Sequence, residues 1–118
     1  MASLNKVMLI GNLGKDPEIN YTQSGEPVMN FSVATTDKWT SKSGDPMEKT
    51  EWHDCFIFGR TADLMMEYCK AGTLLYVEGS LQKGKPYTNK EGLEIQKTEV
   101  KCFKVNWLHN TKRMEDHQ

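Results

Sequence analysis

In two segments of the chain, side chains alternate with the two-residue period of a β-strand that is buried on one side. Between residues 28 and 36, Met29, Phe31 and Val33 fall on one face, and the even-numbered residues, mostly polar, fall on the other. Between residues 51 and 58, Trp52, Asp54, Phe56 and Phe58 share one face, and His53, Cys55 and Ile57 share the opposite face. Because successive strand side chains point to opposite faces, this pattern predicts a sheet with one face on a core.

The rest of the chain predicts three more strands, a short strand-like piece and one helix. The strands are expected at residues 4–13, 73–81 and 93–108, and the short piece at residues 18–22. The helix is expected to start at a Thr61 cap, to have Lys70 near its negative end and to stop at Gly72, with an apolar face of Leu64, Met65, Tyr68 and Cys69. In the last strand the apolar parity slips between Cys102 and Phe103, which predicts a bulge or a bend.

Five strands with a single helix between the third and the fourth predict an all-β fold, the five-stranded Greek-key barrel known as the OB-fold. The chain of 118 residues has the length of one domain. We assign residues 1–108 to the barrel and residues 109–118 to a short polar C-terminal segment. Residues 37–46 and 82–90 are expected to be long loops, between strands two and three and between strands four and five.

Three large aromatic residues lie beside lysines in polar segments. They are Trp39, Trp52 and Tyr87. A ring next to cations on an exposed surface suits an unpaired nucleic-acid strand, whose bases stack on the ring while its phosphates meet the lysines. Trp52 and Phe58 strengthen this hypothesis, since even spacing on one strand puts both rings on the same side of the sheet. The alternative is that the rings fold back as lids over the barrel rim.

Charge and cysteine content exclude several classes of protein. The net charge is −1, so no overall basic excess supports a nucleic-acid partner, although residues 81–92 contain three lysines and one glutamate. Cys55, Cys69 and Cys102 lie far apart in apolar segments, which is typical of reduced core thiols. We expect no metal site, no cofactor and no membrane span, and the start of the chain lacks the features of a secretory signal. These observations predict a cytoplasmic protein.

Several ordered segments resemble the bacterial and phage single-stranded-DNA-binding proteins. The resemblance covers roughly residues 4–107 and rests on the segments at 5–18, 31–36, 50–53, 58–62 and 76–79. It implies an OB-fold subunit that forms a homotetramer and binds single-stranded DNA without sequence preference. The stacking residues of the family would correspond to Trp39, Trp52, Phe58 and, after one inserted residue, Tyr87. The basic contacts would correspond to Lys6, Arg60, Lys70, Lys83 and Lys85, and Lys38, Lys42 and Lys49 are added from loop position alone.

The sequence departs from the pattern of this family at two places. Asp54 follows Trp52 and His53 where family members often have a basic residue, and a carboxylate there would repel phosphate. The chain also stops at Gln118 without the flexible linker and acidic tip of bacterial members. It is therefore expected to be a shortened piece or a phage or plasmid version, and replication or repair proteins are not expected to dock through such a tip. The resemblance places His53 at a subunit contact, with a satisfied sheet histidine as the alternative.

Three other functions compete with a coat protein for single-stranded DNA in replication, recombination and repair. One is a primosome-type OB-fold dimer that bridges DNA and helicase-loading proteins, and another is an RNA-binding OB module. The third is an enzyme, which the sequence disfavours because it offers no nucleophile beside a base and no phosphate loop. His53 and Asp54 are adjacent in a strand and face opposite ways, so they are not expected to cooperate as an acid–base pair.

Overall fold

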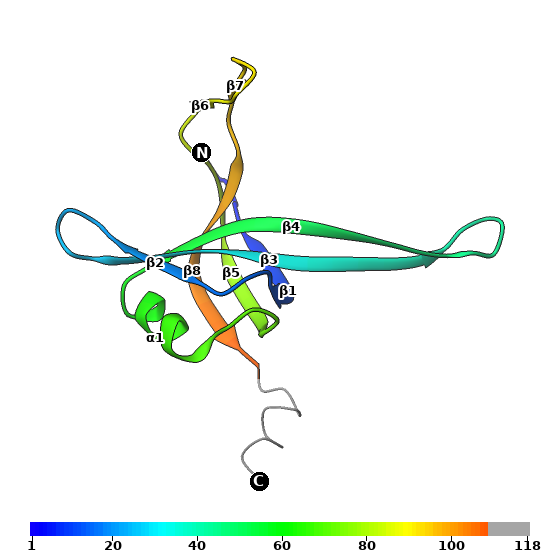
Figure 1. Cartoon of the computed structure of the whole chain (residues 1–118), viewed down its shortest axis with the longest axis horizontal. Helices are drawn as coiled ribbons and strands as arrows, with labels where there is room; N and C mark the ends of the chain where they lie inside the picture. Colours follow the sequence, from blue (N-terminus) through cyan, green and yellow to red (C-terminus); the bar gives the residue numbers. More distant parts are fainter. Residues whose placement is uncertain (109–118) are drawn as a thin grey trace, which may run out of the picture.

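The computed structural model describes residues 1–108, and the C-terminal segment 109–118 lies outside the described residues. The described part contains strands and one helix (Figure 1). The elements, in chain order, are β1 (Val7–Leu13), β2 (Glu18–Tyr21), β3 (Pro27–Thr40), β4 (Pro46–Phe58), α1 (Arg60–Tyr68), β5 (Leu74–Lys83), β6 (Tyr87–Thr88), β7 (Glu94–Ile95) and β8 (Thr98–Trp107).

The main sheet closes on itself to form a barrel. Its strand order is β1-β5-β8-β4-β3-β2, and a further pairing of β1 with β3 joins the two sides. The pairing of β4 with β8 is parallel and every other pairing of these strands is antiparallel. Five strands, β1, β3, β4, β5 and β8, therefore make the barrel, with α1 between the third and fourth of them, as the sequence predicted.

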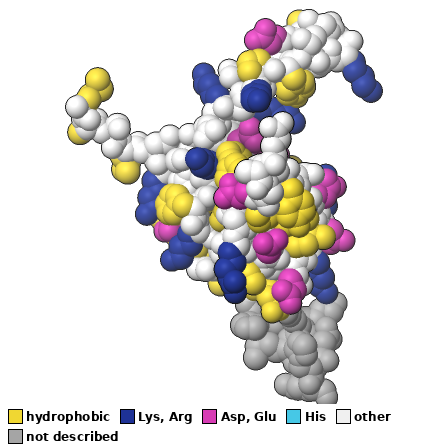
Figure 2. Space-filling view, turned by 90° about the vertical axis from the view of Figure 1, so that its left-hand side faces the viewer, with side chains coloured by type: hydrophobic (Ala, Val, Ile, Leu, Met, Phe, Trp, Pro, Cys, Tyr) yellow, Lys and Arg dark blue, Asp and Glu magenta, His cyan; other side chains and the backbone are white. Residues whose placement is uncertain are grey.

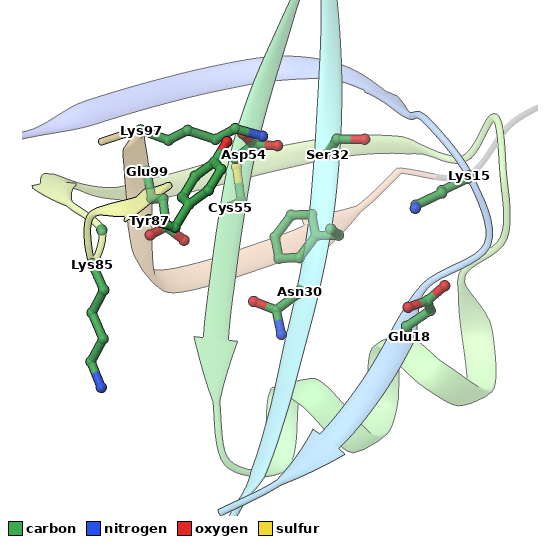
Figure 3. Close-up of a pocket in the computed structure, with 12 residues that line it drawn as sticks. Lys15, Glu18, Asn30, Ser32, Asp54, Cys55, Lys85, Tyr87, Lys97 and Glu99 are labelled. Atoms are coloured by element: carbon green, nitrogen blue, oxygen red, sulfur yellow. The ribbon is translucent and has the colours of Figure 1, made fainter. Parts of the chain in front are cut away.

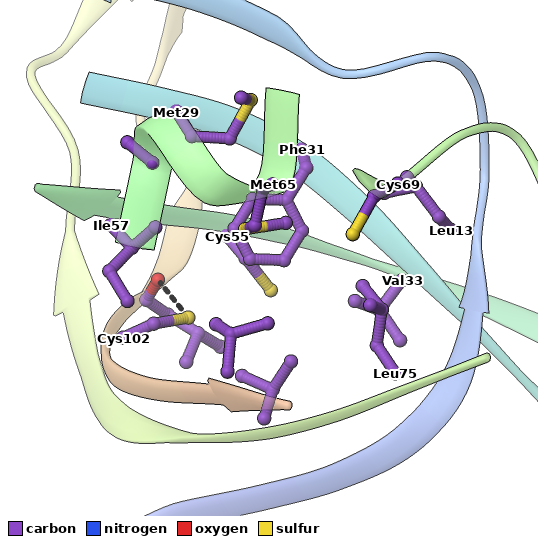
Figure 4. Close-up of a cluster of buried hydrophobic side chains, with 14 residues drawn as sticks. Leu13, Met29, Phe31, Val33, Cys55, Ile57, Met65, Cys69, Leu75 and Cys102 are labelled. Carbon is purple, nitrogen blue, oxygen red and sulfur yellow. Dashed lines mark hydrogen bonds between the residues drawn. The ribbon is translucent and has the colours of Figure 1, made fainter. Parts of the chain in front are cut away.

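The core occupies the inside of this barrel and follows the predicted alternation (Figure 4). Met29 and Val33 of β3 are fully buried, and α1 adds Met65, packed against the same cluster. The three cysteines are also buried, as expected of core thiols. A hydrogen bond with the Cys102 thiol, together with burial, raises the pKa of the Cys55 thiol far above its ordinary value, so this thiol stays protonated and unreactive.

The connection between β3 and β4 differs from the prediction, because most of residues 37–46 is strand. β3 continues to Thr40 and β4 starts at Pro46, in unbroken register from Val28↔Phe58 to Thr40↔Pro46. Threonine and tryptophan favour extended backbone, and the hydroxyls of Thr36 and Thr50 are hydrogen-bonded across the two strands at 2.9 Å. The polar character of this segment predicts a loop, but pairing with β4 up to Thr40↔Pro46 holds most of it extended.

A five-residue turn, residues 41–45, closes this long hairpin. The Ser41 amide donates to the Asp45 carbonyl and the Gly44 amide donates to the Ser41 carbonyl, both at 2.9 Å. Within this turn the Ser41–Asp45 hydrogen bond encloses residues 42–44, and Gly44 ends this inner loop with a φ of 90°, a conformation that glycine adopts without strain. The same hydrogen-bond pattern recurs between Asn89 and Leu93, where it closes the β6–β7 hairpin.

The second expected loop also contains strand. Residues 82–90 include the end of β5 and all of β6, and β6 pairs with β7 to form a small separate hairpin that extends from the barrel (Figure 1). The predicted fifth strand at 93–108 is thus divided into β7 and β8. The predicted bulge is confirmed: Glu78 pairs with Lys104 and Gly79 with Cys102, which leaves Phe103 without a partner on β5.

The helix begins and ends earlier than predicted. Gly59, not Thr61, occupies the N-cap position, and no side chain caps the first turn. Lys70 lies beyond the helix because the local amides have other acceptors: the Lys70 amide donates to the Thr73 hydroxyl at 3.0 Å and the Ala71 amide donates to the Asp16 carboxylate at 2.8 Å. These two bonds fold residues 70–73 into a turn that leads to β5.

Candidate nucleic-acid interface

The outward face of β4 presents aromatic rings to solvent. Trp52 and Phe58 lie on this face, and their exposed fractions are 60% and 39%. Phe56 lies between them in sequence and supports Phe58 through an edge-to-face contact, with ring centroids 5.7 Å apart. The inward residues Cys55 and Ile57 are buried, so the strand separates core from exposed rings as the alternation predicted.

Trp52 lies directly over the backbone at the end of β1. A Cβ atom added to Gly14 would lie 2.5 Å from Cζ3 of the Trp52 indole and 2.6 Å from Oγ of Ser32. Ser32 also accepts a hydrogen bond from the Gly14 amide through its backbone carbonyl, at 2.9 Å. The absence of a side chain at position 14 therefore allows the ring to lie against the barrel and still expose most of its surface.

A groove of about 460 Å³ lies beside these rings, on the outer side of the barrel. Its floor is the outer part of β3 and β4, one wall is the β1–β2 turn with the start of β2, and the other wall is the arm between β5 and β8 (Figure 3). In Figure 3, Tyr87 and Lys97 extend from this arm toward Asp54, whereas the side chain of Lys85 points away from Asp54. The groove is lined by Lys15, Glu18, Asn30, Phe31, Ser32, Asp54, Cys55, Gly84, Lys85, Tyr87, Lys97 and Glu99.

The groove contains equal numbers of cationic and anionic side chains. The cations are Lys15, Lys85 and Lys97, and the anions are Glu18, Asp54 and Glu99. Among the described residues, none of these six takes part in an ion pair of 4.0 Å or less. Both kinds of charge therefore remain available to a ligand, the lysines to phosphate and the carboxylates to hydrogen-bond donors.

Trp39 is held by a strand and lies away from this groove. It pairs with Met47 near the end of the β3–β4 hairpin, in a hollow of about 580 Å³, and 47% of its surface is exposed. Ala34 is the partner of Trp52, and Trp39 is five residues further along β3. An odd spacing reverses the face, so Trp39 and Trp52 lie on opposite faces of the same two-stranded ribbon. Lys38, next to Trp39, is on the Trp52 face.

Most of the other predicted basic residues are dispersed around the barrel, and the face seen in Figure 2 shows Lys and Arg side chains scattered among acidic and hydrophobic ones. Lys42 lies in the hairpin turn, Arg60 begins α1, Lys70 follows α1 and Lys83 ends β5, and all four are exposed. Lys49 is ion-paired with Glu51 at 3.1 Å. Of the predicted DNA-contacting residues within the described chain, the structure brings only Lys85 and Tyr87 into the groove beside Asp54.

Lys6 belongs to a different surface, on the outer side of β1 and β5. Its ammonium group lies 3.7 Å from the Glu78 carboxylate, which also accepts a hydrogen bond from the Tyr76 hydroxyl at 2.7 Å. The Tyr76 hydrogen bond, with smaller contributions from Lys6 and Lys104, lowers the pKa of Glu78, and the same bond raises the pKa of Tyr76. The carboxylate is thus held in its charged form.

Sequence reasoning missed several residues that line the groove. Alternation puts Asn30 and Ser32 on the face of their strand opposite to Met29, Phe31 and Val33, but it does not show which loops lie beside that face. Lys15, Lys97 and Glu99 come from two walls that the chain brings together only in three dimensions. One feature of the sequence could have indicated two of them: Lys97 and Glu99 are two residues apart, so in an extended segment their side chains lie on the same face.

His53 is half-buried on the inward-facing side of β4. Its Nε2 atom is hydrogen-bonded to the Thr35 hydroxyl at 2.9 Å. Among residues 1–108, no group of three histidine, cysteine, aspartate or glutamate side chains is placed to hold a metal ion. The same part of the chain contains no helix with the length and apolar character needed to cross a bilayer.

Comparison with known proteins gives a consistent result. The sequence matches the single-strand binding protein family over residues 4–108. The chain belongs to this family. It is 48% identical over 109 residues to single-stranded DNA-binding protein 1 of Xylella fastidiosa, covering 92% of this chain and 79% of that protein. It is also 48% identical over 92 residues to the single-stranded DNA-binding protein of Neisseria meningitidis, covering 78% of this chain and 52% of that protein.

Solved structures of related proteins share the fold. The Plasmodium falciparum SSB in complex with ssDNA superimposes with a TM-score of 0.81 and 30% identity, covering 92% of this chain and 98% of that one. A deletion mutant of the single-stranded DNA binding protein from Thermus aquaticus gives a TM-score of 0.76 and 27% identity, covering 92% of this chain and 52% of that one. The OB-fold prediction is therefore confirmed. The chain spans about half the length of the Neisseria and Thermus relatives.

Proposed function

We propose that this protein binds single-stranded DNA and coats it during replication, recombination and repair. The observation that carries the proposal is the row of exposed rings on β4, beside a groove with lysines on both of its walls. Base–aromatic stacking contributes about 1 to 3 kcal/mol per base and accepts every base, while lysines neutralise phosphates. Membership of the single-strand binding protein family supports this coat function over a primosome-type bridging function.

Each residue that we propose to contact DNA lies on an identified part of the fold. Trp52 and Phe58 offer stacking surfaces on the barrel, Tyr87 offers one from the β5–β8 arm, and Trp39 offers one at the end of the hairpin. Lys85 lines the same groove as Tyr87, and Lys38 lies on the Trp52 face of the hairpin. The remaining cations, Lys6, Arg60, Lys42, Lys49, Lys70 and Lys83, would contribute along a path that leaves the groove. The proposed activity is binding and involves no catalytic step.

The test is a titration of dye-labelled oligo-dT with the protein, followed by fluorescence anisotropy at several salt concentrations. We expect Trp52→Ala and Trp39→Ala each to weaken binding by about tenfold, and Tyr87→Ala by less, since its ring is smaller. Trp107→Phe is the matched control. Trp107 lies away from the groove and stacks on Tyr68, with ring centroids 6.1 Å apart, so its replacement should not affect binding. Unchanged affinity in all three alanine variants would refute the stacking proposal.

We further propose that four copies of the chain assemble in the cytoplasm and that His53 contributes to a subunit contact. The outer side of β1 exposes Met8 and Ile10 by 63% and 61%, which is apolar surface that a subunit interface would cover. One DNA strand that crosses several subunits gains affinity, because each additional contact is intramolecular. Sedimentation equilibrium checks this: a monomer at micromolar concentration contradicts the tetramer, and an unchanged mass for His53→Ala contradicts the role of His53.

A further inference from the structure

Asp54 occupies an unusual place for an anion, between two aromatic residues on the outward face of β4. Its neighbours on that face are Trp52 and Phe56, two residues away on either side, and Ser32 is directly opposite on β3. The side chain is exposed and lines the groove. No hydrogen bond or ion pair links it to another of residues 1–108. Tyr87 and Lys97 extend toward the carboxylate (Figure 3), but neither is bonded to it, so it can still accept a hydrogen bond from a ligand.

This position suits the edge of a base better than a phosphate. A carboxylate repels phosphate, and the groove lysines at Lys15 and Lys85 are better placed to bind the backbone on either wall. Residues two apart in a strand are separated by about 7 Å, so a base stacked on Trp52 reaches over Asp54 with its edge. Asp54 then meets the hydrogen-bonding groups of that base.

The chemistry of a carboxylate selects among bases. An ionised carboxylate only accepts hydrogen bonds, and the exocyclic amino group of cytosine is a donor. Thymine and uracil present a carbonyl oxygen at the same position, and their ring N–H group lies between two carbonyl oxygens that repel a carboxylate. The same side chain thus attracts one pyrimidine and disfavours the other two.

We propose that Asp54 is a specificity-determining residue that accepts a hydrogen bond from the amino group of a base stacked on Trp52. This inference rests on the proposed binding of single-stranded DNA and adds a base preference to it. The preference is a bias within sequence-tolerant binding, because stacking and phosphate contacts apply to every base.

The test compares oligo-dC with oligo-dU of equal length at pH 8, each short enough to occupy one subunit. The two strands differ only at ring positions 3 and 4, where cytosine has an acceptor nitrogen and an amino group and uracil has an N–H group and a carbonyl, so differences in stacking and charge are small. We expect the wild-type protein to bind oligo-dC about three- to tenfold more tightly, as for one hydrogen bond to a charged group near solvent. In Asp54→Asn the affinity for oligo-dU should rise, because a repulsive charge is lost, whereas oligo-dC also loses its charged hydrogen bond, so the ratio of the two affinities should fall to about one.

Glu67→Gln is the matched control, since it removes one negative charge from the exposed surface of α1, away from the groove. It should leave the ratio of the two affinities as in the wild type. Equal wild-type affinities for oligo-dC and oligo-dU, or a ratio that survives in Asp54→Asn, would overturn the inference and leave the binding function standing. A wild-type protein that binds neither oligonucleotide overturns both proposals.

Discussion

Replacement of Gly14 by alanine tests whether the position of the Trp52 ring determines binding. The new Cβ atom would lie 2.5 Å from Cζ3 of the indole, whereas carbon atoms in contact are ordinarily about 3.5 to 4.0 Å apart. The ring must therefore move outward by about 1 Å or more. Because the ring is exposed, it has room to move, and the stability of the fold should change little.

The effect on binding follows from the size of this displacement. A gap of about 1 Å removes up to about half of the dispersion energy of a contact. Applied to a stacking contribution of about 1 to 3 kcal/mol, this loss is about 0.5 to 1.5 kcal/mol. Gly14→Ala should thus weaken oligo-dT binding by about two- to tenfold, since 1.4 kcal/mol corresponds to a factor of ten.

The assay is the anisotropy titration, combined with a double-mutant cycle. In the Trp52→Ala background no ring remains to be displaced, so adding Gly14→Ala should have a much smaller effect on affinity, limited to the displacement of the Ser32 hydroxyl that lies 2.6 Å from the same Cβ position. Circular dichroism and thermal melting establish that each variant is folded. The reasoning is refuted if folded Gly14→Ala binds as tightly as the wild type, or if it weakens binding equally with and without the indole.

Two further substitutions address stability. Gly79→Ala places a Cβ atom against the backbone carbonyl of Lys101, which cannot move aside, so urea denaturation should show a loss of about 3 kcal/mol; a loss below about 1 kcal/mol would contradict this steric account. Glu78→Gln removes a carboxylate whose pKa is held below its ordinary value of 4.5 by Tyr76 and Lys6. A lowered folded pKa stabilises the protein above pH 4.5 and loses this effect as the pH falls through the folded value, so the difference in Tm between wild type and Glu78→Gln should be constant from pH 7 to about 5 and shrink below. A difference that grows on acidification would contradict the assigned direction.

The barrel could be predicted from the sequence because the alternation of apolar and polar residues in a strand shows which face is buried. Met29, Phe31 and Val33 had to face a core, and the slip at Phe103 had to be absorbed by a bulge. The length of the β3–β4 hairpin was not predicted, because its outer part is exposed on both faces and contains charged residues. What keeps it extended is cross-strand pairing, such as that of Thr36 with Thr50, which a single segment of sequence does not reveal.

The candidate site was predictable in part. The common face of Trp52 and Phe58 followed from parity on one strand. The groove did not, because its walls come from the segments at Lys15 and Lys97, which are more than eighty residues apart in the chain. Helix ends were also missed, since the acceptors that end α1 include Asp16, a residue from another element.

The opposite orientation of Trp39 and Trp52 on one ribbon has a consequence for the path of a bound strand. A short oligonucleotide lying on either side can stack on only one of the two indoles. A longer oligonucleotide must bend around the edge of the β3–β4 hairpin to reach both indoles, so the hairpin would change the direction of the bound DNA. The number of quenched tryptophans should therefore increase in a step as the oligonucleotide is lengthened.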